Sequence, residues 1–358
     1  MAASAIEWPD AARRLAFERW LASVATRHGI DPGSLEPASA DASFRRYLRL
    51  RASGTPAGSL IVMDAPPPRE DVRPFVKVAR LADAAGLNVP LVLECDEARG
   101  FLLLTDLGRR TLFDALREAS PGEADALMRA AIGALVRWQV GVPASALPRY
   151  DQAQLESELA LFPMWCVGRE FGITWDGAQQ AAWKRITLLL MGSALAQPVL
   201  AVHADYMPRN LMVGGVHGVP GVTGPEPGIL DFQDAVAGPI TYDLASLLRD
   251  AFLSWDEEQE IDWAVRYWEA ARRAALPVPA DFGEFWQAME WMGLQRHLRV
   301  LGIFCRLKHR DGKAHYAADL PRFFGYCTKV ALRYRPLAPL LALLAPMSGQ
   351  ALASGFTF

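Results

Sequence analysis

The sequence predicts an α+β fold of two lobes, a small lobe with a mixed or antiparallel sheet and a larger lobe that is mostly helical. Short apolar strands alternate with helices over the first hundred residues, whereas helical spacing dominates after about residue 112. The segment Thr105-Asp106-Leu107-Gly108 separates the two patterns. We therefore expect one lobe over residues 1–104 and a second over residues 105–358.

The small lobe is expected to contain four strands and two helices. Apolar runs separated by glycine-containing or acidic turns predict the strands, and helical periodicity predicts the helices. Gly29 and Gly86 follow the two helices, where glycine commonly ends a helix. The strands are residues 44–50, 59–63, 91–95 and 101–104, and the helices are residues 10–27 and 70–85.

The large lobe is expected to consist mainly of helices around short strands. Residues 199–202 and 211–213 are apolar and flank a polar turn, and the Gly/Pro-rich residues 214–228 are expected to form a flexible hairpin loop. The expected helices are residues 112–119, 123–140, 152–164, 175–196, 242–252, 257–275, 282–310 and 321–334.

Composition limits the class of protein. Hydrophobic residues make up 51% of the 358 residues and charged residues 22%, which is ordinary for a globular protein. The net charge of −3 favours neither nucleic acid nor a membrane surface, and the four scattered cysteines predict reduced, buried thiols. The N-terminus shows no signal peptide, and the apolar residues 336–346 are too few to span a bilayer. We expect a cytoplasmic, monomeric enzyme.

The polar turn between residues 202 and 211 carries the clearest chemistry. Asp205 and Asn210 lie five residues apart on it, and Asp231 ends a later apolar strand. Phosphoryl transfer needs a carboxylate for the attacking hydroxyl and oxygen ligands for Mg²⁺ on the triphosphate. Asp205 fits the role of catalytic base, and Asn210 and Asp231 fit the role of metal ligands. The pattern favours a kinase that uses ATP and Mg²⁺.

These spacings resemble the catalytic loop of the kinase superfamily. The opening His203-Ala204-Asp205, without a following lysine, is similar to the aminoglycoside phosphotransferase and choline kinase branch, which acts on small molecules. The resemblance implies a two-lobed protein-kinase-like fold. It also implies structural support of the loop by His203 and Asp243, although a carboxylate such as Asp243 at a helix start is also an ordinary cap.

The expected nucleotide contacts depart from the kinase pattern. The turn over the ATP phosphates would contain Ser43, Phe44, Arg45 and Arg46, but no glycine. The strand over residues 60–64 lacks the usual lysine. One of the two arginines could replace it, or triphosphate binding could rely on Mg²⁺ and the backbone. Alternatively, both arginines are strand residues that face solvent. The missing lysine separately leaves open a protein that binds nucleotide without turnover.

The residues between the lobes are expected to form a hinge that binds adenine. Backbone groups near Thr105 and Leu107 would pair with the base. A plain buried strand and turn is the alternative interpretation.

Two further regions predict substrate contacts. Gln233 and Asp234 lie close to Asp231 in the sequence and could enter the pocket. A strongly basic helix over residues 292–307 carries Arg299 and Arg306 seven residues apart, hence on one face. An anionic substrate is one explanation for this helix, and a solvated face is the other.

Five blocks together resemble the anomeric N-acetylmuramate/N-acetylglucosamine kinases of bacterial cell-wall recycling. They are residues 41–47, 63–67, 230–235, 238–244 and 292–307. The resemblance implies transfer of the γ-phosphoryl group of ATP to the C1 hydroxyl of the sugar, giving a sugar 1-phosphate for peptidoglycan recycling and UDP-sugar synthesis. The lactyl carboxylate of N-acetylmuramate could then pair with Arg299 or Arg306. A kinase of another hydroxyl, on an aminoglycoside or amino alcohol, and a nucleotide-binding module without turnover remain as alternatives.

Overall fold

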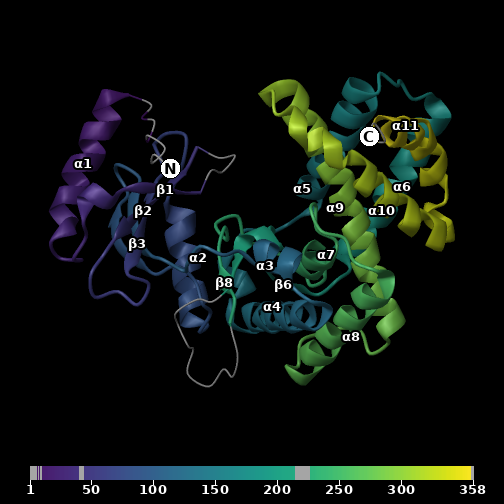
Figure 1. The fold of residues 1–358 in the computed structure, drawn as a ribbon. Coiled ribbons are helices and arrows are strands. Elements are labelled where there is room, and N and C mark those ends of the chain that lie inside the picture. Colours follow the sequence, from purple (N-terminus) through teal and green to yellow (C-terminus); the bar gives the residue numbers. More distant parts are fainter. Residues whose placement is uncertain (1–5, 7, 9, 40–43, 214–225, 356–358) are drawn as a thin grey trace. The chain divides into compact units, whose positions relative to one another are not determined.

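The computed structural model describes residues 6, 8, 10–39, 44–213 and 226–355. The chain forms two compact units (Figure 1). The first comprises Met1–Val142 and Pro208–Ala235, and the second comprises Pro143–Met207 and Val236–Phe358. The predicted boundary between a lobe of residues 1–104 and a lobe of residues 105–358 stays a prediction.

The first unit is built on a five-stranded antiparallel sheet with the order β1-β2-β3-β5-β4. This small antiparallel sheet, together with the helices that follow, confirms the predicted α+β fold class. The sequence did not indicate β1, because its Glu-Pro-Ala-Ser segment lacks strand-forming residues; a proline is tolerated in such an edge strand. The strands are β1 Glu36–Ser39, β2 Arg46–Arg51, β3 Ser59–Asp64, β4 Val92–Asp96 and β5 Phe101–Thr105.

One face of this sheet packs against α1 (Ala11–Ala25). Phe17 and Trp20 of α1 lie in one apolar cluster with Leu48 and Leu50 of β2, and also with buried residues of β3 and β5. Because side chains alternate along a strand, the odd-numbered residues of β2 face the opposite side. The two faces of the sheet therefore have different partners.

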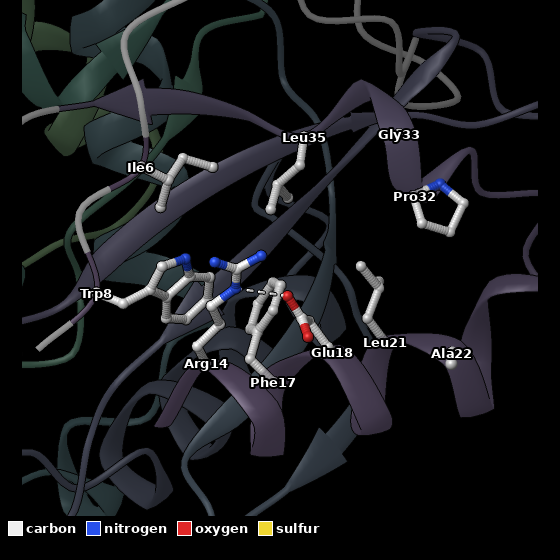
Figure 2. Close-up of a pocket in the computed structure, with 10 residues that line it drawn as sticks. All are labelled: Ile6, Trp8, Arg14, Phe17, Glu18, Leu21, Ala22, Pro32, Gly33 and Leu35. Carbon is white, nitrogen blue, oxygen red and sulfur yellow. Dashed lines mark hydrogen bonds and ion pairs between the residues drawn. The ribbon is translucent and has the colours of Figure 1, made fainter. Parts of the chain in front are cut away.

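A cavity of about 610 Å³ lies along α1 (Figure 2). Its lining is mostly apolar and includes Trp8, Leu21 and Leu35, with the surface ion pair between Arg14 and Glu18 at 2.7 Å. None of the residues that the sequence predicts for the site lines this cavity. It is therefore separate from the predicted site.

In the described part of the first unit, three α-helices and a short hairpin accompany the sheet and α1. β7 (Leu211–Met212) and β8 (Gly228–Ile229) pair antiparallel, so the Gly/Pro-rich stretch does connect two paired strands; residues 214–225 of that predicted loop lie outside the described residues. The helices are α2 Arg73–Ala84, α3 Leu112–Glu118 and α4 Pro121–Gly141.

The second unit is mostly helical and packs around α9, whose buried face includes Leu294, Leu298 and Leu301. β6 (Val199–Val202) pairs antiparallel with β9 (Val236–Pro239). The helices are α5 Gln152–Leu159, α6 Gly177–Leu195, α7 Tyr242–Leu248, α8 Glu257–Arg273, α9 Phe282–Asp311, α10 Leu320–Arg333 and α11 Pro339–Gly355.

Two helix predictions need correction. The helix expected over residues 152–164 ends as α5 at Leu159, and a π-helical segment, Phe162–Glu170, follows. Pro163 disfavours continuation of an α-helix, and α9 approaches so closely that a Cβ at Gly302 would lie 2.5 Å from the carbonyl carbon of Leu161. The second correction is α11, which the sequence did not indicate because it begins at Pro339 and contains Pro346.

Burial clarifies two other expectations. The apolar residues of α11, such as Leu340, Leu344 and Met347, are buried in the core of the second unit. Across the part of the chain that the structure describes, no helix has the length and apolar character needed to cross a membrane. Three cysteines are buried free thiols as expected, but Cys95 is exposed.

Candidate active site

The predicted catalytic loop begins in the second unit, directly after β6. His203 is fully buried, and so is Asp243 in the first turn of α7. The carboxylate of Asp243 accepts hydrogen bonds from the backbone N–H groups of His203 at 2.6 Å and of Ala204 at 3.1 Å. These two bonds tie the start of the loop to the helix.

The loop turns sharply at Ala204, whose φ of 78° lies in the left-handed region. A non-glycine residue there carries local strain, which is characteristic of functional sites. The backbone N–H of Asp205 donates to Nδ1 of His203 at 3.3 Å, and the backbone N–H of Met207 donates to the carbonyl of Asp205 at 2.9 Å. The loop therefore holds Asp205 in a defined, partly exposed position.

The protonation of Asp243 is unusual for an aspartate. Burial raises its pKa to about 7, although the two N–H groups of His203 and Ala204 act in the opposite direction. The charge of this carboxyl group therefore changes near neutral pH.

Arg299 belongs to the same group of side chains in the second unit. Its Nη1 donates to the phenol oxygen of Tyr242 at 2.8 Å, and its Nε lies 3.5 Å from Oε1 of Glu158. Interactions with Tyr242, then with Glu158 and Asp205, raise the pKa of Arg299 above its ordinary value against the effect of burial. A permanently charged guanidinium therefore acts electrostatically on Asp205.

Arg306, seven residues further along α9, has different surroundings. Its Nε is buried and has no hydrogen-bond partner among the described residues. Burial, and then the nearby charge of Arg310, lowers its pKa. Much of the remaining basic charge at this end of α9 is paired, since Lys308 and His309 both contact Glu170 at 2.6 Å.

The predicted metal ligands lie together in the first unit. The backbone N–H of Leu230 donates to the carbonyl of Asn210 at 2.9 Å, which extends the β7–β8 pairing. As a result, Nδ2 of Asn210 lies 3.2 Å from Oδ2 of Asp231, and Nε2 of Gln233 lies 2.8 Å from Oδ1 of Asp231. Asp231 also has a positive φ of 62°.

This donor set fits Mg²⁺. Amide oxygen and nitrogen atoms exchange places by a simple flip, so Asn210 can present oxygen beside the carboxylate. Oε1 of Gln233 is buried without a hydrogen-bond partner in the described part of the chain. Within the same part, no group of three or more His, Cys, Asp or Glu residues gathers as a metal site. One carboxylate with amide oxygens suits the few, hard ligands that Mg²⁺ takes from proteins.

The two predicted substrate residues that follow Asp231 differ in exposure. Gln233 is buried and contacts Asp231, whereas Asp234 is exposed and lies 3.4 Å from Nε2 of Gln233. Gln233 is thus placed to orient the carboxylate of Asp231. The sugar contacts predicted for both residues stay predictions.

The predicted phosphate-binding turn is described only in part. Ser43 lies outside the described residues, and Phe44 is exposed, with the guanidinium of Arg69 4.9 Å from its ring. Arg45 and Arg46 are both partly buried and ion-paired, to Glu70 and Asp64 respectively. Neither is a simple solvent-facing strand residue.

The predicted hinge is a tightly bonded segment. The backbone N–H of Thr105 donates to the carbonyl of Leu91 at 3.1 Å, and Leu107 is buried. Between them, the buried carboxylate of Asp106 accepts hydrogen bonds from Arg49 at 2.5 Å and Ser59 at 2.6 Å. The sequence did not single out this Asp106 cluster, because its partners lie far away along the chain.

Solved structures share this fold. A choline/ethanolamine kinase family protein from Mesorhizobium loti matches with a TM-score of 0.60 at 17% identity, covering 91% of this chain and 98% of the other. An ADP-bound aminoglycoside phosphotransferase matches with a TM-score of 0.56 at 15% identity, covering 90% and 99%. At these identities the likeness establishes the fold alone, and it confirms the predicted protein-kinase-like architecture.

Curated relatives are much closer in sequence. Proteins named N-acetylmuramate/N-acetylglucosamine kinase match from Pseudomonas aeruginosa, at 50% identity over 89% of this chain and 90% of the relative, and from Neisseria meningitidis serogroup B, at 45% over 97% and 99%. The model of the phosphotransferase enzyme family matches residues 34–285. The resemblance indicated by the sequence blocks is confirmed.

The fold and the loop residues define a kinase-like phosphotransferase that acts on small molecules with ATP. The chain belongs to the phosphotransferase enzyme family.

Proposed function

We propose that this protein transfers the γ-phosphoryl group of ATP to the anomeric C1 hydroxyl of N-acetylmuramate and N-acetylglucosamine. The observation that carries the proposal is the 45–50% identity, over nearly the whole chain, to relatives named for these two sugars. Asp205, Asn210 and Asp231 are all present, which supports turnover rather than nucleotide binding alone. The sugar 1-phosphate would serve UDP-sugar synthesis in peptidoglycan recycling.

In the proposed reaction, the C1 oxygen forms a bond to the γ-phosphorus while the bond from this phosphorus to the β,γ-bridging oxygen breaks, and ADP leaves. The C1 hydroxyl proton passes to the carboxylate of Asp205. An anomeric hydroxyl is more acidic than an ordinary alcohol, so a carboxylate base of modest strength is sufficient. The rest of the catalytic effect comes from positioning by the strained loop, which two hydrogen bonds hold to Asp243.

We assign the metal to Asn210 and Asp231, with Gln233 orienting the carboxylate. Bound there, Mg²⁺ would neutralise charge on the triphosphate as it develops during transfer. The nucleotide contacts of Thr105 and Leu107 remain part of the proposal.

We assign the lactyl carboxylate of N-acetylmuramate to Arg299 rather than to Arg306. Arg299 acts electrostatically on Asp205, where the C1 hydroxyl must lie, and its guanidinium is held by Tyr242 and Glu158. Arg306 interacts electrostatically with Arg310, Asp311 and Arg299 instead. The two sugars would therefore differ in one ionic contact.

A panel of acceptors tests the proposal, with ADP formation as the readout. We expect turnover with N-acetylmuramate and N-acetylglucosamine and none with aminoglycosides, choline or ethanolamine. Turnover confined to aminoglycosides, choline or ethanolamine would replace the proposal with the alternative function. If none of the acceptors in the panel supported ADP formation, the proposal would be refuted.

A further inference from the structure

The first unit lacks a residue that kinases use to hold the triphosphate. A lysine on the third strand normally contacts the phosphates and forms an ion pair with a helix glutamate. Here β3 has the sequence Ser-Leu-Ile-Val-Met-Asp, without a lysine. Its Leu60 and Val62 lie in the core beneath α1, so Ile61 and Met63 occupy the opposite face of the strand. No cation of β3 is available for the phosphates on either face.

Arg46 belongs to the α1 face of the sheet. It lies directly opposite Asp64 in the β2–β3 register and forms an ion pair with it. Asp64 is fully buried and is also bound by Arg13 of α1, whose Nε lies 2.9 Å away. The guanidinium of Arg46 lies 4.4 Å from the centre of the Trp8 ring. All of these partners tie Arg46 to α1 and the core.

Arg45, one residue earlier, belongs to the other face. Its Nε lies 2.9 Å from Oε2 of Glu70, and the two side chains are only 14% and 12% exposed. Arg49, four residues further along, lies on the same face and reaches Asp106 and the carbonyl of Gly108 in the predicted hinge. Arg45 therefore lies on the face that carries the expected nucleotide segment.

We propose that Arg45, oriented by Glu70, is the cation that binds the ATP phosphates in place of the missing lysine, while Arg46 is structural. The Arg45–Glu70 pair reproduces the cation–carboxylate pair of other kinases with different residues. A guanidinium stays charged and has five N–H donors in a planar fork, so it can hold a carboxylate and phosphate oxygens together. The inference rests on the proposed kinase function and adds the group that anchors its nucleotide.

Nucleotide affinity measured by calorimetry without any sugar tests the inference. Arg45→Gln should weaken ATP and ADP binding about ten- to a hundredfold and leave adenosine binding unchanged. Arg46→Gln is the matched control, since it neutralises the neighbouring arginine; it should lower the melting temperature and leave the ratio of ATP to adenosine affinity as in the wild type. An equal loss of ATP selectivity in both variants would overturn the assignment.

Charge exchange distinguishes a phosphate contact from a purely structural ion pair. The double variant Arg45→Glu/Glu70→Arg keeps the pair but moves the cation, so it should remain weak for ATP even if its melting temperature recovers. Recovery of ATP affinity would show that only the pair matters and would refute the inference. If Arg45→Gln fails to fold, Arg45→Lys replaces it, because it retains the charge without the planar fork. This variant should lose part of the wild-type preference for ATP over adenosine. No loss of this preference, together with no effect of Glu70→Gln, would overturn the proposal.

These measurements remain separate from the identity of the acceptor. ATP selectivity that depends on Arg45 would stand even if the acceptor panel rejected both amino sugars. Conversely, normal sugar phosphorylation with unchanged nucleotide affinity in Arg45→Gln would remove the inference and leave the proposed function in place.

Discussion

The carboxylate of Asp243 accepts a hydrogen bond from the backbone N–H of His203 across 2.6 Å, and both residues are fully buried. This contact joins the first turn of α7 to the segment that leaves β6. Since the next residue, Ala204, has left-handed backbone, the loop needs such support to hold its shape. Asp243 therefore links the stability of the second unit to the position of Asp205.

Asp243→Asn should change how stability depends on pH. Burial raises the pKa of Asp243 from 3.8 to about 7 in the folded protein. The folded state then holds this proton to higher pH than the unfolded state, so the contribution to stability is complete below pH 3.8 and is lost as pH rises through 7. Urea unfolding of wild type between pH 5 and 8 should show a decline that the variant lacks. Parallel profiles would contradict this assignment.

Asp205→Asn should reduce turnover by about 10²- to 10⁴-fold and leave ATP affinity nearly unchanged, because the base is lost while its volume is kept. Asp83→Asn makes the same chemical change at an exposed position of α2 outside the predicted site and should have little effect. Steady-state kinetics and nucleotide titration measure both quantities. Retention of more than about a tenth of wild-type turnover would remove Asp205 from the role of base.

Asp231→Ala should raise the Mg²⁺ concentration needed for ATP binding as well as for turnover, since it removes the charged ligand. Asn210→Ala should act in the same direction but less strongly, because it removes a neutral ligand. Asp83→Ala, which deletes an exposed carboxylate of α2 outside the predicted site, serves as the control. Calorimetric ATP titrations at several Mg²⁺ concentrations measure the effect. An unchanged Mg²⁺ dependence in Asp231→Ala would show that the metal is held elsewhere.

Candidate site residues that lie close together along the chain could be proposed from the sequence, and most helices and strands could be predicted. The spacing of Asp205 and Asn210 is local, as is the placement of Asp231 after a strand. Residue type alone could not distinguish Arg45 from Arg46, because a one-residue shift in strand register exchanges the two faces of a strand. The observed pairing of Arg46 with Asp64 distinguishes the surroundings of the two side chains.

Other features depend on contacts between distant segments. Glu158 of α5 forms an ion pair with Arg299 of α9, and no local sequence pattern predicts that pair. The end of α5 depends on the close approach of Gly302 as well as on Pro163. The burial of α11 likewise outweighs the helix-breaking tendency of Pro346 inside it.

Arg299→Gln should lower kcat/KM for N-acetylmuramate by about one to two decades and spare N-acetylglucosamine, since a bond between charged groups is lost with only one of the sugars. Arg306→Gln is the matched control on the same helix and should leave the ratio between the sugars unchanged. Kinetics with both sugars decide the matter. An equal loss for both sugars in Arg299→Gln would indicate a general role in the pocket and discard the carboxylate contact.

The central claim is transfer to the anomeric hydroxyl. Its most direct test is to incubate the protein with ATP, Mg²⁺ and N-acetylglucosamine and to locate the phosphate by phosphorus–proton correlation NMR, in parallel with the methyl glycoside of the same sugar, whose C1 oxygen is blocked. The account predicts phosphorus coupled to the C1 proton and no product from the methyl glycoside. Phosphate on another carbon, or phosphorylation of the methyl glycoside, would contradict it.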